Sequence, residues 1–153
     1  MLLKEEREAV VAYGRRLVTH RLTRGTGGNV SILCRAKGLF AISPSGMDYF
    51  ETESADVVVM DLEGRVAEGS RRPSSESDMH RLLYREREDV GAVVHTHSPY
   101  ATVLACLHRE LPPVHYLIGF AGRSVRCTPY APFGTPEPTT RSEERRVGKE
   151  CRS

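Results

Sequence analysis

Two histidines separated by one residue, His95 and His97, carry the strongest chemical signal in the sequence. They follow the apolar segment Val90–Val94, and side chains two positions apart on a strand project from the same face. Two neutral imidazoles on one face can bind one divalent ion, and zinc suits this type of donor. The alternative is a polar pair at a strand end with hydrogen bonds to the backbone. A zinc site needs a third protein ligand, and no neighbour in the sequence is an obvious one.

A second group of polar residues lies where a helix is expected to begin, directly after Pro73. Ser74 or Ser75 can serve as the N-cap, and Asp78 can complete a capping box. Hydroxyls and free N–H groups at a helix start also bind anions such as phosphate. Glu76 in the first helical turn would then lie beside the bound phosphate, placed to donate or accept a proton. Capping alone and anion binding both stay open at this point.

Two turn-forming segments could let a ligand approach the backbone closely: the glycine-rich Gly25–Ser31, which contains Asn29, and Ser43–Gly46. Neither has the glycine spacing of a dinucleotide-binding loop or of a P-loop. A flexible turn is the simpler interpretation of each segment, and a core aromatic is the simpler interpretation of Tyr116. The chain has no Gly-x-Ser-x-Gly elbow, so nucleophilic hydrolysis has no support.

The elements that must position these residues alternate between helices and short strands. Residues 4–21 have the periodicity of an amphipathic helix, with Val10, Tyr13 and Leu17 on one stripe. The other expected elements are a hairpin of Val30–Cys34 and Leu39–Ile42, strands at Asp56–Leu62, Arg65–Ala67 and Val90–Thr96, helices at Pro73–Glu86 and Pro99–His108, and apolar segments at Val114–Phe120 and Val125–Thr128. We therefore predict one α/β domain with a central mixed, largely antiparallel sheet flanked by helices.

Composition excludes several classes of protein. The 153 residues include 22 Lys and Arg against 20 Asp and Glu, and this formal charge of +2 is too small to indicate a nucleic-acid or membrane partner. No stretch approaches the ~20 apolar residues that span a bilayer, and the N-terminus has no signal-peptide core. The four cysteines are scattered without a C-x-x-C pair, as expected for reduced thiols. We expect a cytoplasmic protein.

Five motifs occur in order along the chain: Gly27-Gly28-Asn29-Val-Ser31, Ser43-Pro-Ser45-Gly46, Pro73-Ser74-Ser75-Glu76, Val-His95-Thr-His97 and Val-His115-Tyr116. In this order they resemble the class II aldolase family, and most of all its bacterial fuculose-phosphate branch. The likeness covers about residues 3–138. It implies a zinc-dependent homotetramer that cleaves a ketose 1-phosphate of the L-fuculose 1-phosphate type. The products would be dihydroxyacetone phosphate and an aldehyde.

The resemblance also implies a role for each residue that matches a family motif. His95, His97 and Glu76 would bind the zinc ion, and Glu76 would also be the acid and base of the reaction. Tyr116 would reach the site of a neighbouring subunit as a proton donor. The residues that would hold phosphate and adjacent substrate oxygens are Gly28, Asn29, Ser45, Gly46, Ser74 and Ser75.

Other functions on the same scaffold are alternatives. The family includes phosphosugar epimerases and methylthioribulose-phosphate dehydratases, which reuse the histidine pair and the phosphate loops. It also includes non-catalytic oligomerisation modules, as in the adducin head. A module of that kind is expected to lack the histidine pair or the glutamate, and this chain keeps His95, His97 and Glu76.

The C-terminal residues depart from the family pattern. The family has a third zinc-binding histidine further along, and this chain has no histidine after His115. Residues 141–153 hold five basic against three acidic residues, which leaves residues 1–140 neutral, and they resemble the translation of a sequencing adaptor. We therefore expect residues 1–140 to be the N-terminal part of a truncated aldolase domain and residues 141–153 to be a foreign tail. Such a chain is expected to be inactive or nearly so.

Overall fold

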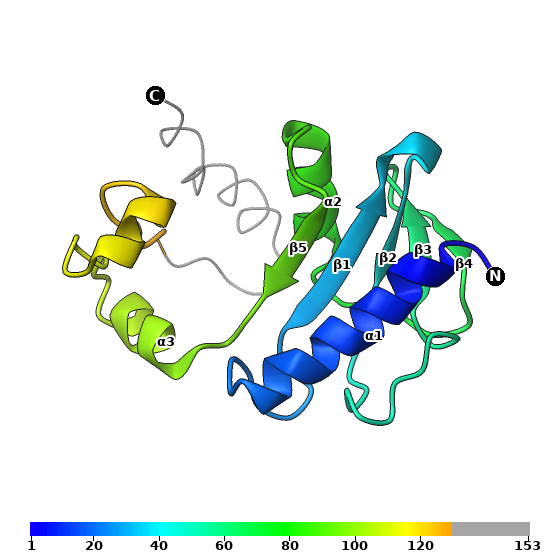
Figure 1. Ribbon diagram of the computed structural model, residues 1–153, viewed down its shortest axis with the longest axis horizontal. Coiled ribbons are helices and arrows are strands. Elements are labelled where there is room, and N and C mark those ends of the chain that lie inside the picture. Colours follow the sequence, from blue (N-terminus) through cyan, green and yellow to red (C-terminus); the bar gives the residue numbers. More distant parts are fainter. Residues whose placement is uncertain (130–153) are drawn as a thin grey trace. The chain divides into compact units, whose positions relative to one another are not determined.

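A five-stranded sheet organises the first part of the chain (Figure 1). The computed structural model describes residues 1–129, which divide into two compact units, one ending at Ser98 and the other beginning at Pro99. The strands are β1 (Asn29–Cys34), β2 (Leu39–Ile42), β3 (Val58–Asp61), β4 (Val66–Glu68) and β5 (Ala92–His95), in the spatial order β4-β3-β2-β1-β5.

Every strand pairing among the described residues is antiparallel. The predicted α/β architecture with a largely antiparallel sheet is therefore confirmed, and its predicted mixed character is wrong for these residues. The physical reason is that β1 to β4 follow one another through connections that reverse the chain, and β5 then enters beside β1 in the opposite direction. The predicted hairpin is present, closed by a short 3₁₀ helix, η1 (Arg35–Lys37).

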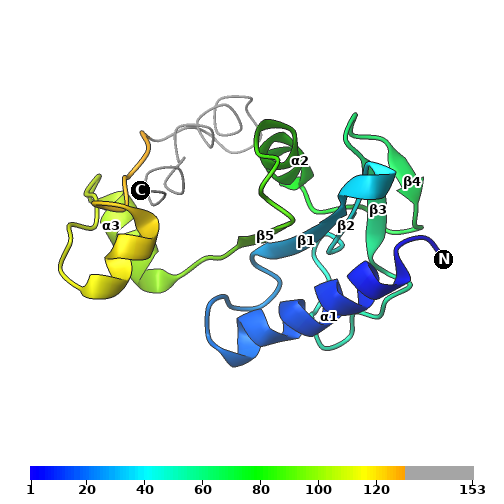
Figure 2. The same ribbon diagram turned by 45° about the horizontal axis from the view of Figure 1, so that its top comes forward.

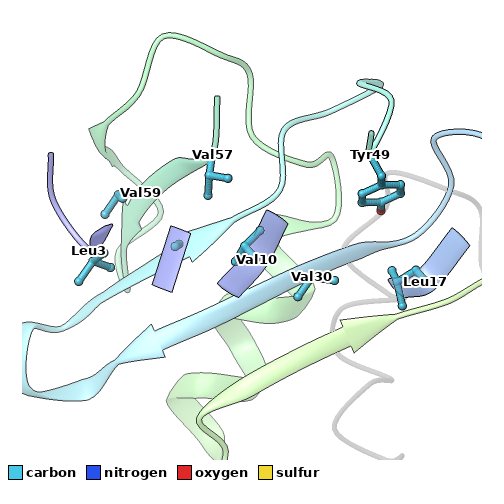
Figure 3. Packing of buried hydrophobic residues seen from close by; sticks show 8 residues of the cluster. Leu3, Val10, Leu17, Val30, Tyr49, Val57 and Val59 are labelled. Atoms are coloured by element: carbon cyan, nitrogen blue, oxygen red, sulfur yellow. The ribbon is translucent and has the colours of Figure 1, made fainter. Parts of the chain in front are cut away.

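Helix α1 (Lys4–Thr19) covers one face of the sheet (Figure 1 and Figure 2). The buried residues on this face are Leu3, Val10, Leu17, Val30, Ala41, Tyr49, Val57 and Val59 (Figure 3). The predicted stripe is wrong at Tyr13, which is 49% exposed, and Gly14 is buried instead. A Cβ on Gly14 would lie 2.6 Å from the Tyr49 ring, so the glycine leaves the room that this aromatic side chain occupies.

Helix α2 (Ser77–Glu86) packs on the opposite face. A second buried cluster lies there, made of Leu33, Phe40, Ile42, Val58, Met60 and Tyr84. The rings of Phe40 and Tyr84 are 5.5 Å apart, so an aromatic contact joins α2 to β2. The sheet is thus covered on both faces, and the two helices hold the strand ends in place.

The start of α2 differs from the sequence prediction. The helix begins at Ser77, so Glu76 is its N-cap and does not lie in the first turn. The predicted capping box is absent, because the Asp78 carboxylate pairs with Arg81 at 3.0 Å. Ser74 instead forms the turn that leads into the helix, since its O accepts from the Ser77 N–H at 3.0 Å and its Oγ from the Glu76 N–H at 3.3 Å. Its own N–H donates to Ser43 O at 3.1 Å, beside the turn after β2.

The second unit has little secondary structure among its described residues. It contains α3 (Pro99–Cys106), the 3₁₀ helix η2 (Tyr116–Ala121) and an isolated bridge between Leu111 and Val125. The predicted helix from Pro99 is present, and the apolar segment Val114–Phe120 largely forms η2. The predicted boundary at residue 140 and the predicted tail, residues 141–153, lie outside the described residues. None of the described helices is long and apolar enough to cross a membrane.

Candidate metal centre

The three predicted binding segments of the first unit adjoin one another at a single edge of the sheet. In the register of the sheet, β1 begins at this edge at Asn29, β2 ends at Ile42 and β5 ends at His95, as antiparallel neighbours require. A bridge between Pro44 and Pro73 joins the turn after β2 to the segment before α2. The glycine-rich turn, the serine-containing turn and the start of α2 therefore meet next to the histidine pair.

Glu76, His95 and His97 each bring one ligand atom within 4.8 Å of the others. His95 Nε2 lies 3.0 Å from His97 Nε2 and 3.3 Å from Glu76 Oε2. Ligands at about 2.0–2.1 Å from a tetrahedral zinc ion are about 3.3–3.4 Å apart, so these atoms are spaced like neighbouring ligands of one ion. Two imidazoles and a carboxylate form a donor set that catalytic zinc sites use, with the fourth position left for water or substrate. The residues fit a divalent ion.

Asn29 ties the Glu76 carboxylate to the sheet. Its Nδ2 donates to Glu76 Oε2 at 2.6 Å, and Asn29 is the cross-strand partner of His95. The Asn29 side chain is buried, and its Oδ1 has no hydrogen-bond partner among the described residues. A buried oxygen without a donor destabilises a fold by about 1–3 kcal/mol. This oxygen can therefore accept a hydrogen bond from a ligand hydroxyl at a net gain.

Gly28 allows the glycine-rich turn to approach β5. Its φ is 72°, and a Cβ there would lie 2.6 Å from His95 O. The Tyr49 hydroxyl fixes the turn from the other side by donating to Gly28 O at 2.8 Å. Burial, and after it the negative charge of Glu76, raises the pKa of Tyr49 to about 12, so this hydroxyl keeps its proton. Tyr49 was missed by sequence reasoning because it lies in a loop with no motif.

The other predicted phosphate-binding residues differ in exposure. Ser74 is buried, and its Oγ accepts a hydrogen bond from the Glu76 N–H at 3.3 Å. Ser45, Gly46 and Ser75 are exposed at the same edge. Exposed hydroxyls and backbone N–H groups at one edge are an arrangement that can receive an anion.

Tyr116 belongs to the second unit. It is the first residue of η2, and its side chain is 80% exposed. Its ring lies 4.4 Å from that of His115. The structure therefore describes Tyr116 in a different unit from Glu76, His95 and His97.

Three buried polar residues lie beside the cluster and were given no role from the sequence: Ser31, His80 and Tyr84. His80 lies on the predicted helix, where a surface or partly packed position is the simplest expectation, and it is fully buried next to Ser31 and Tyr84. Burial, with a smaller effect from His95, lowers the pKa of His80 to about 3, so the ring is neutral at physiological pH. The signal that could have found His80 and Tyr84 is their spacing from Glu76, because positions four apart share one helix face.

Comparison with known proteins gives consistent matches. The chain matches the model of the class II aldolase and adducin N-terminal domain over residues 8–151. It is 59% identical over 137 residues to the 5-deoxy-D-ribulose 1-phosphate aldolase of Bacillus thuringiensis serovar kurstaki, a match that covers 90% of this chain and 64% of the relative. It is 44% identical over 132 residues to the 5-methylthioribulose-1-phosphate/5-deoxyribulose-1-phosphate aldolase of Rhodospirillum rubrum, covering 86% of this chain and 58% of the relative.

A solved structure gives the same result. An L-fuculose 1-phosphate aldolase is similar with a TM-score of 0.85 and 49% sequence identity, over 89% of this chain and 64% of that one. The chain thus spans less than two thirds of the length of these relatives. The family match covers most of the chain, and it includes all three residues of the cluster as well as the segments that adjoin them. This chain belongs to the class II aldolase and adducin N-terminal domain family.

Proposed function

We propose that this chain is part of a zinc-dependent aldolase that cleaves a ketose 1-phosphate. The observation that supports this most is the cluster of Glu76, His95 and His97, whose ligand atoms lie within 4.8 Å of one another. A non-catalytic member of the family has no need of two imidazoles and a carboxylate that converge on one point. The relatives named above, which are aldolases of ketose 1-phosphates, support the same conclusion.

Glu76, His95 and His97 would hold the ion. When bound, it would polarise substrate oxygens as a Lewis acid and stabilise the negative charge of the enediolate that cleavage of the carbon–carbon bond leaves. Both histidines must offer an unprotonated Nε2 for this, so metal binding is expected to weaken as the imidazoles are protonated in acid.

Glu76 would move the proton at carbon. Its Oε2 accepts a hydrogen bond from Asn29 Nδ2 at 2.6 Å, which orients the carboxyl group. In the direction of cleavage, the protonated carboxyl group would deliver its proton to C3 of the enediolate; in the direction of condensation, the carboxylate would remove it. Because Asn29 begins β1, the sheet fixes the oxygen that carries this proton.

The phosphate would bind at the edge of the sheet, where the two turns meet the start of α2. The residues proposed to hold it and the adjacent substrate oxygens are Gly28, Asn29, Ser45, Gly46, Ser74 and Ser75. Holding the phosphate fixes the sugar chain relative to Glu76, so that proton transfer occurs with the right geometry.

Tyr116 is proposed as the second proton-transfer group. In cleavage it would accept the proton of the C4 hydroxyl, and in condensation it would return that proton to the aldehyde oxygen. Its exposure, 80%, is consistent with a role at the site of another subunit, as the family resemblance implies for a cytoplasmic homotetramer.

The substrate is proposed to be a ketose 1-phosphate whose far end is a deoxygenated carbon. Cleavage between C3 and C4 of any ketose 1-phosphate leaves C1 to C3 as dihydroxyacetone phosphate, and only the aldehyde differs. The relative that is 59% identical supports 5-deoxyribulose 1-phosphate, which yields acetaldehyde. Fuculose 1-phosphate, which yields lactaldehyde, is the second candidate because of the similar solved structure.

A chimera tests the proposal. The residues of this chain that match the Bacillus thuringiensis aldolase replace the corresponding part of that protein, and release of dihydroxyacetone phosphate is measured with 5-deoxyribulose 1-phosphate, fuculose 1-phosphate and 5-methylthioribulose 1-phosphate. The unmodified chain is assayed beside it, with little turnover expected. Glu76→Gln in the chimera is expected to lower kcat by about 10²–10⁴-fold. His20→Ala, at an exposed histidine of the first unit, is the matched control.

The outcomes decide between functions. A folded, zinc-loaded chimera that cleaves none of the three sugars would overturn the aldolase assignment, as would a Glu76→Gln variant as active as its parent. Ribulose 5-phosphate is assayed as a fourth sugar, and its conversion to an epimer would favour the epimerase. Loss of water from 5-methylthioribulose 1-phosphate without cleavage would favour the dehydratase.

A further inference from the structure

One face of helix α2 contacts one face of strand β1 through polar side chains. On the helix, these side chains follow one another at intervals of about one turn. Glu76, His80 and Tyr84 follow one another at every fourth position of the chain, and Asn29 and Ser31 at every second position of β1. Four helical residues rise about 6 Å and two strand residues about 6.7 Å, so Glu76 and His80 stay nearly in step with Asn29 and Ser31. The Tyr84 hydroxyl also contacts Ser31. We call these five residues the α2–β1 ladder.

Three short hydrogen bonds form the ladder. Asn29 Nδ2 donates to Glu76 Oε2 at 2.6 Å, while Ser31 Oγ lies 2.6 Å from His80 Nδ1 and 2.6 Å from the Tyr84 hydroxyl. Ser31 and His80 are fully buried and Tyr84 is 1% exposed. Movement of α2 by one residue along β1 would break all of these hydrogen bonds at once, and the two to Ser31 are buried away from water that could replace them.

The ladder is not the arrangement that stability alone would favour. His80 Nε2 and Asn29 Oδ1 are buried and have no hydrogen-bond partner among the described residues. Well-packed apolar side chains would leave no such unpaired groups, and replacing buried polar groups in this way is often stabilising. The hydrogen bonds of the ladder are directional and form in one register only, so they fix α2 relative to β1.

The ladder connects to the metal centre through two registers. The pairing of β1 with β5 sets Asn29 opposite His95, and the ladder sets Glu76 opposite Asn29. The distance of 3.3 Å between Glu76 Oε2 and His95 Nε2 depends on both. Glu76 is the N-cap of α2, so its position along the helix axis is held from two sides. The preceding segment holds it through Ser74, whose Oγ accepts from the Glu76 N–H, and contacts further along α2 hold it from the other side.

We propose that Ser31, His80 and Tyr84 are positioning residues, which hold Glu76 in place beside His95 and His97 without touching the substrate. The metal-related half of this proposal rests on the proposed function; the positioning of Glu76 itself does not. The expected consequence is that loss of a ladder hydroxyl displaces the Glu76 carboxylate from Asn29 and from the histidine pair.

The test uses two variants of the chain, Ser31→Ala and Tyr84→Phe, and two measurements. The first is the resonance of the Asn29 side-chain amide in the metal-free chain, whose proton reports the hydrogen bond to Glu76; Glu76→Ala gives the position of the amide without that bond. The second is the affinity for Co²⁺, followed by its visible absorption. Thr52→Val is the matched control, because it removes a buried hydroxyl that donates to Asp48 O and takes no part in the ladder.

We expect both ladder variants to shift the Asn29 resonance toward its position in Glu76→Ala and to weaken Co²⁺ binding about tenfold. The control should leave both measurements at their values in the unsubstituted chain. An unchanged Asn29 resonance and an unchanged Co²⁺ affinity in the ladder variants would overturn the proposal and leave these residues a role in the core only. Tyr84→Phe keeps the ring against Phe40, so it decides the question if Ser31→Ala does not fold. If the unsubstituted chain binds no Co²⁺, the proposed metal centre is wrong, and the Asn29 resonance still decides whether the ladder positions Glu76.

Discussion

The two units of this chain bury their apolar side chains to very different extents. In residues 1–98 the sheet has a buried cluster on each face, and Phe40, Ile42 and Val58 are completely inaccessible to solvent. In the second unit α3 has no buried residue, and Tyr100 is 86% exposed. The histidine pair and Glu76 belong to the first unit.

The difference shows what is needed to fix side chains for chemistry. The ligand atoms of Glu76, His95 and His97 come from two places in the sequence, the start of α2 and the end of β5, which meet the start of β1 at one sheet edge. Tyr116, the other proposed proton-transfer residue, starts a short 3₁₀ helix whose only buried apolar residue with a described side chain is Ile118. We therefore expect substitutions in the first unit to lower the free energy of unfolding and substitutions in the second unit to change it little.

The largest expected effect is that of Phe40→Ala. It removes a fully buried ring that contacts Tyr84, so it should lower the free energy of unfolding by about 3–5 kcal/mol. Leu107→Ala, at a side chain that is 58% exposed in the second unit, should change it by less than about 0.5 kcal/mol. Urea unfolding followed by circular dichroism measures both. Similar losses for the two variants would show that the contrast between the units is not real.

A pH effect of the first unit is expected from His80. Its pKa is about 3 in the fold against an ordinary 6.5, so the unfolded chain binds more protons between these two values. The contribution of His80 to stability is complete above pH 6.5 and is lost as the pH falls toward 3, by at most about 1.4 kcal/mol per pH unit. The free energy of unfolding of the metal-free chain should therefore fall more steeply from pH 7 to pH 4 than that of the His80→Gln variant. Parallel curves would contradict the buried, neutral state of this ring.

Two glycine substitutions, one in each unit, test the same difference in packing with a smaller change in side chain. Gly14→Ala should destabilise by about 1–3 kcal/mol, although alanine favours helices, because its Cβ would lie 2.6 Å from the Tyr49 ring. Gly119→Ala in η2 meets no described atom within 4 Å and should be neutral. Thermal unfolding distinguishes them. A stabilising Gly14→Ala would mean that the Tyr49 ring can move aside.

Local sequence signals predicted most of the elements and part of the site. The hairpin, the buried strand around Val58 and the helix after Pro73 follow from apolar periodicity and turn residues. The histidine pair follows from its spacing at a strand end, since only neighbouring residues are involved.

What could not be predicted depends on contacts between distant residues. No residue near His80 in the sequence indicates that its ring is buried and hydrogen-bonded to Ser31, which lies 49 positions away. Similarly, the burial of Gly14 instead of Tyr13 depends on Tyr49, which arrives from a loop. The hydrogen bond of Ser74 to Ser43, across the sheet edge, is likewise not indicated by the residues around the start of α2.

Calorimetric titration of the chain with Zn²⁺ tests the metal centre itself. We expect one ion per chain, with binding strongly weakened by His95→Ala and by His97→Ala and unchanged by His20→Ala, at a histidine outside the cluster. Equal binding by all four proteins, or no binding by the unsubstituted chain, would contradict the assignment of Glu76, His95 and His97 as a metal centre.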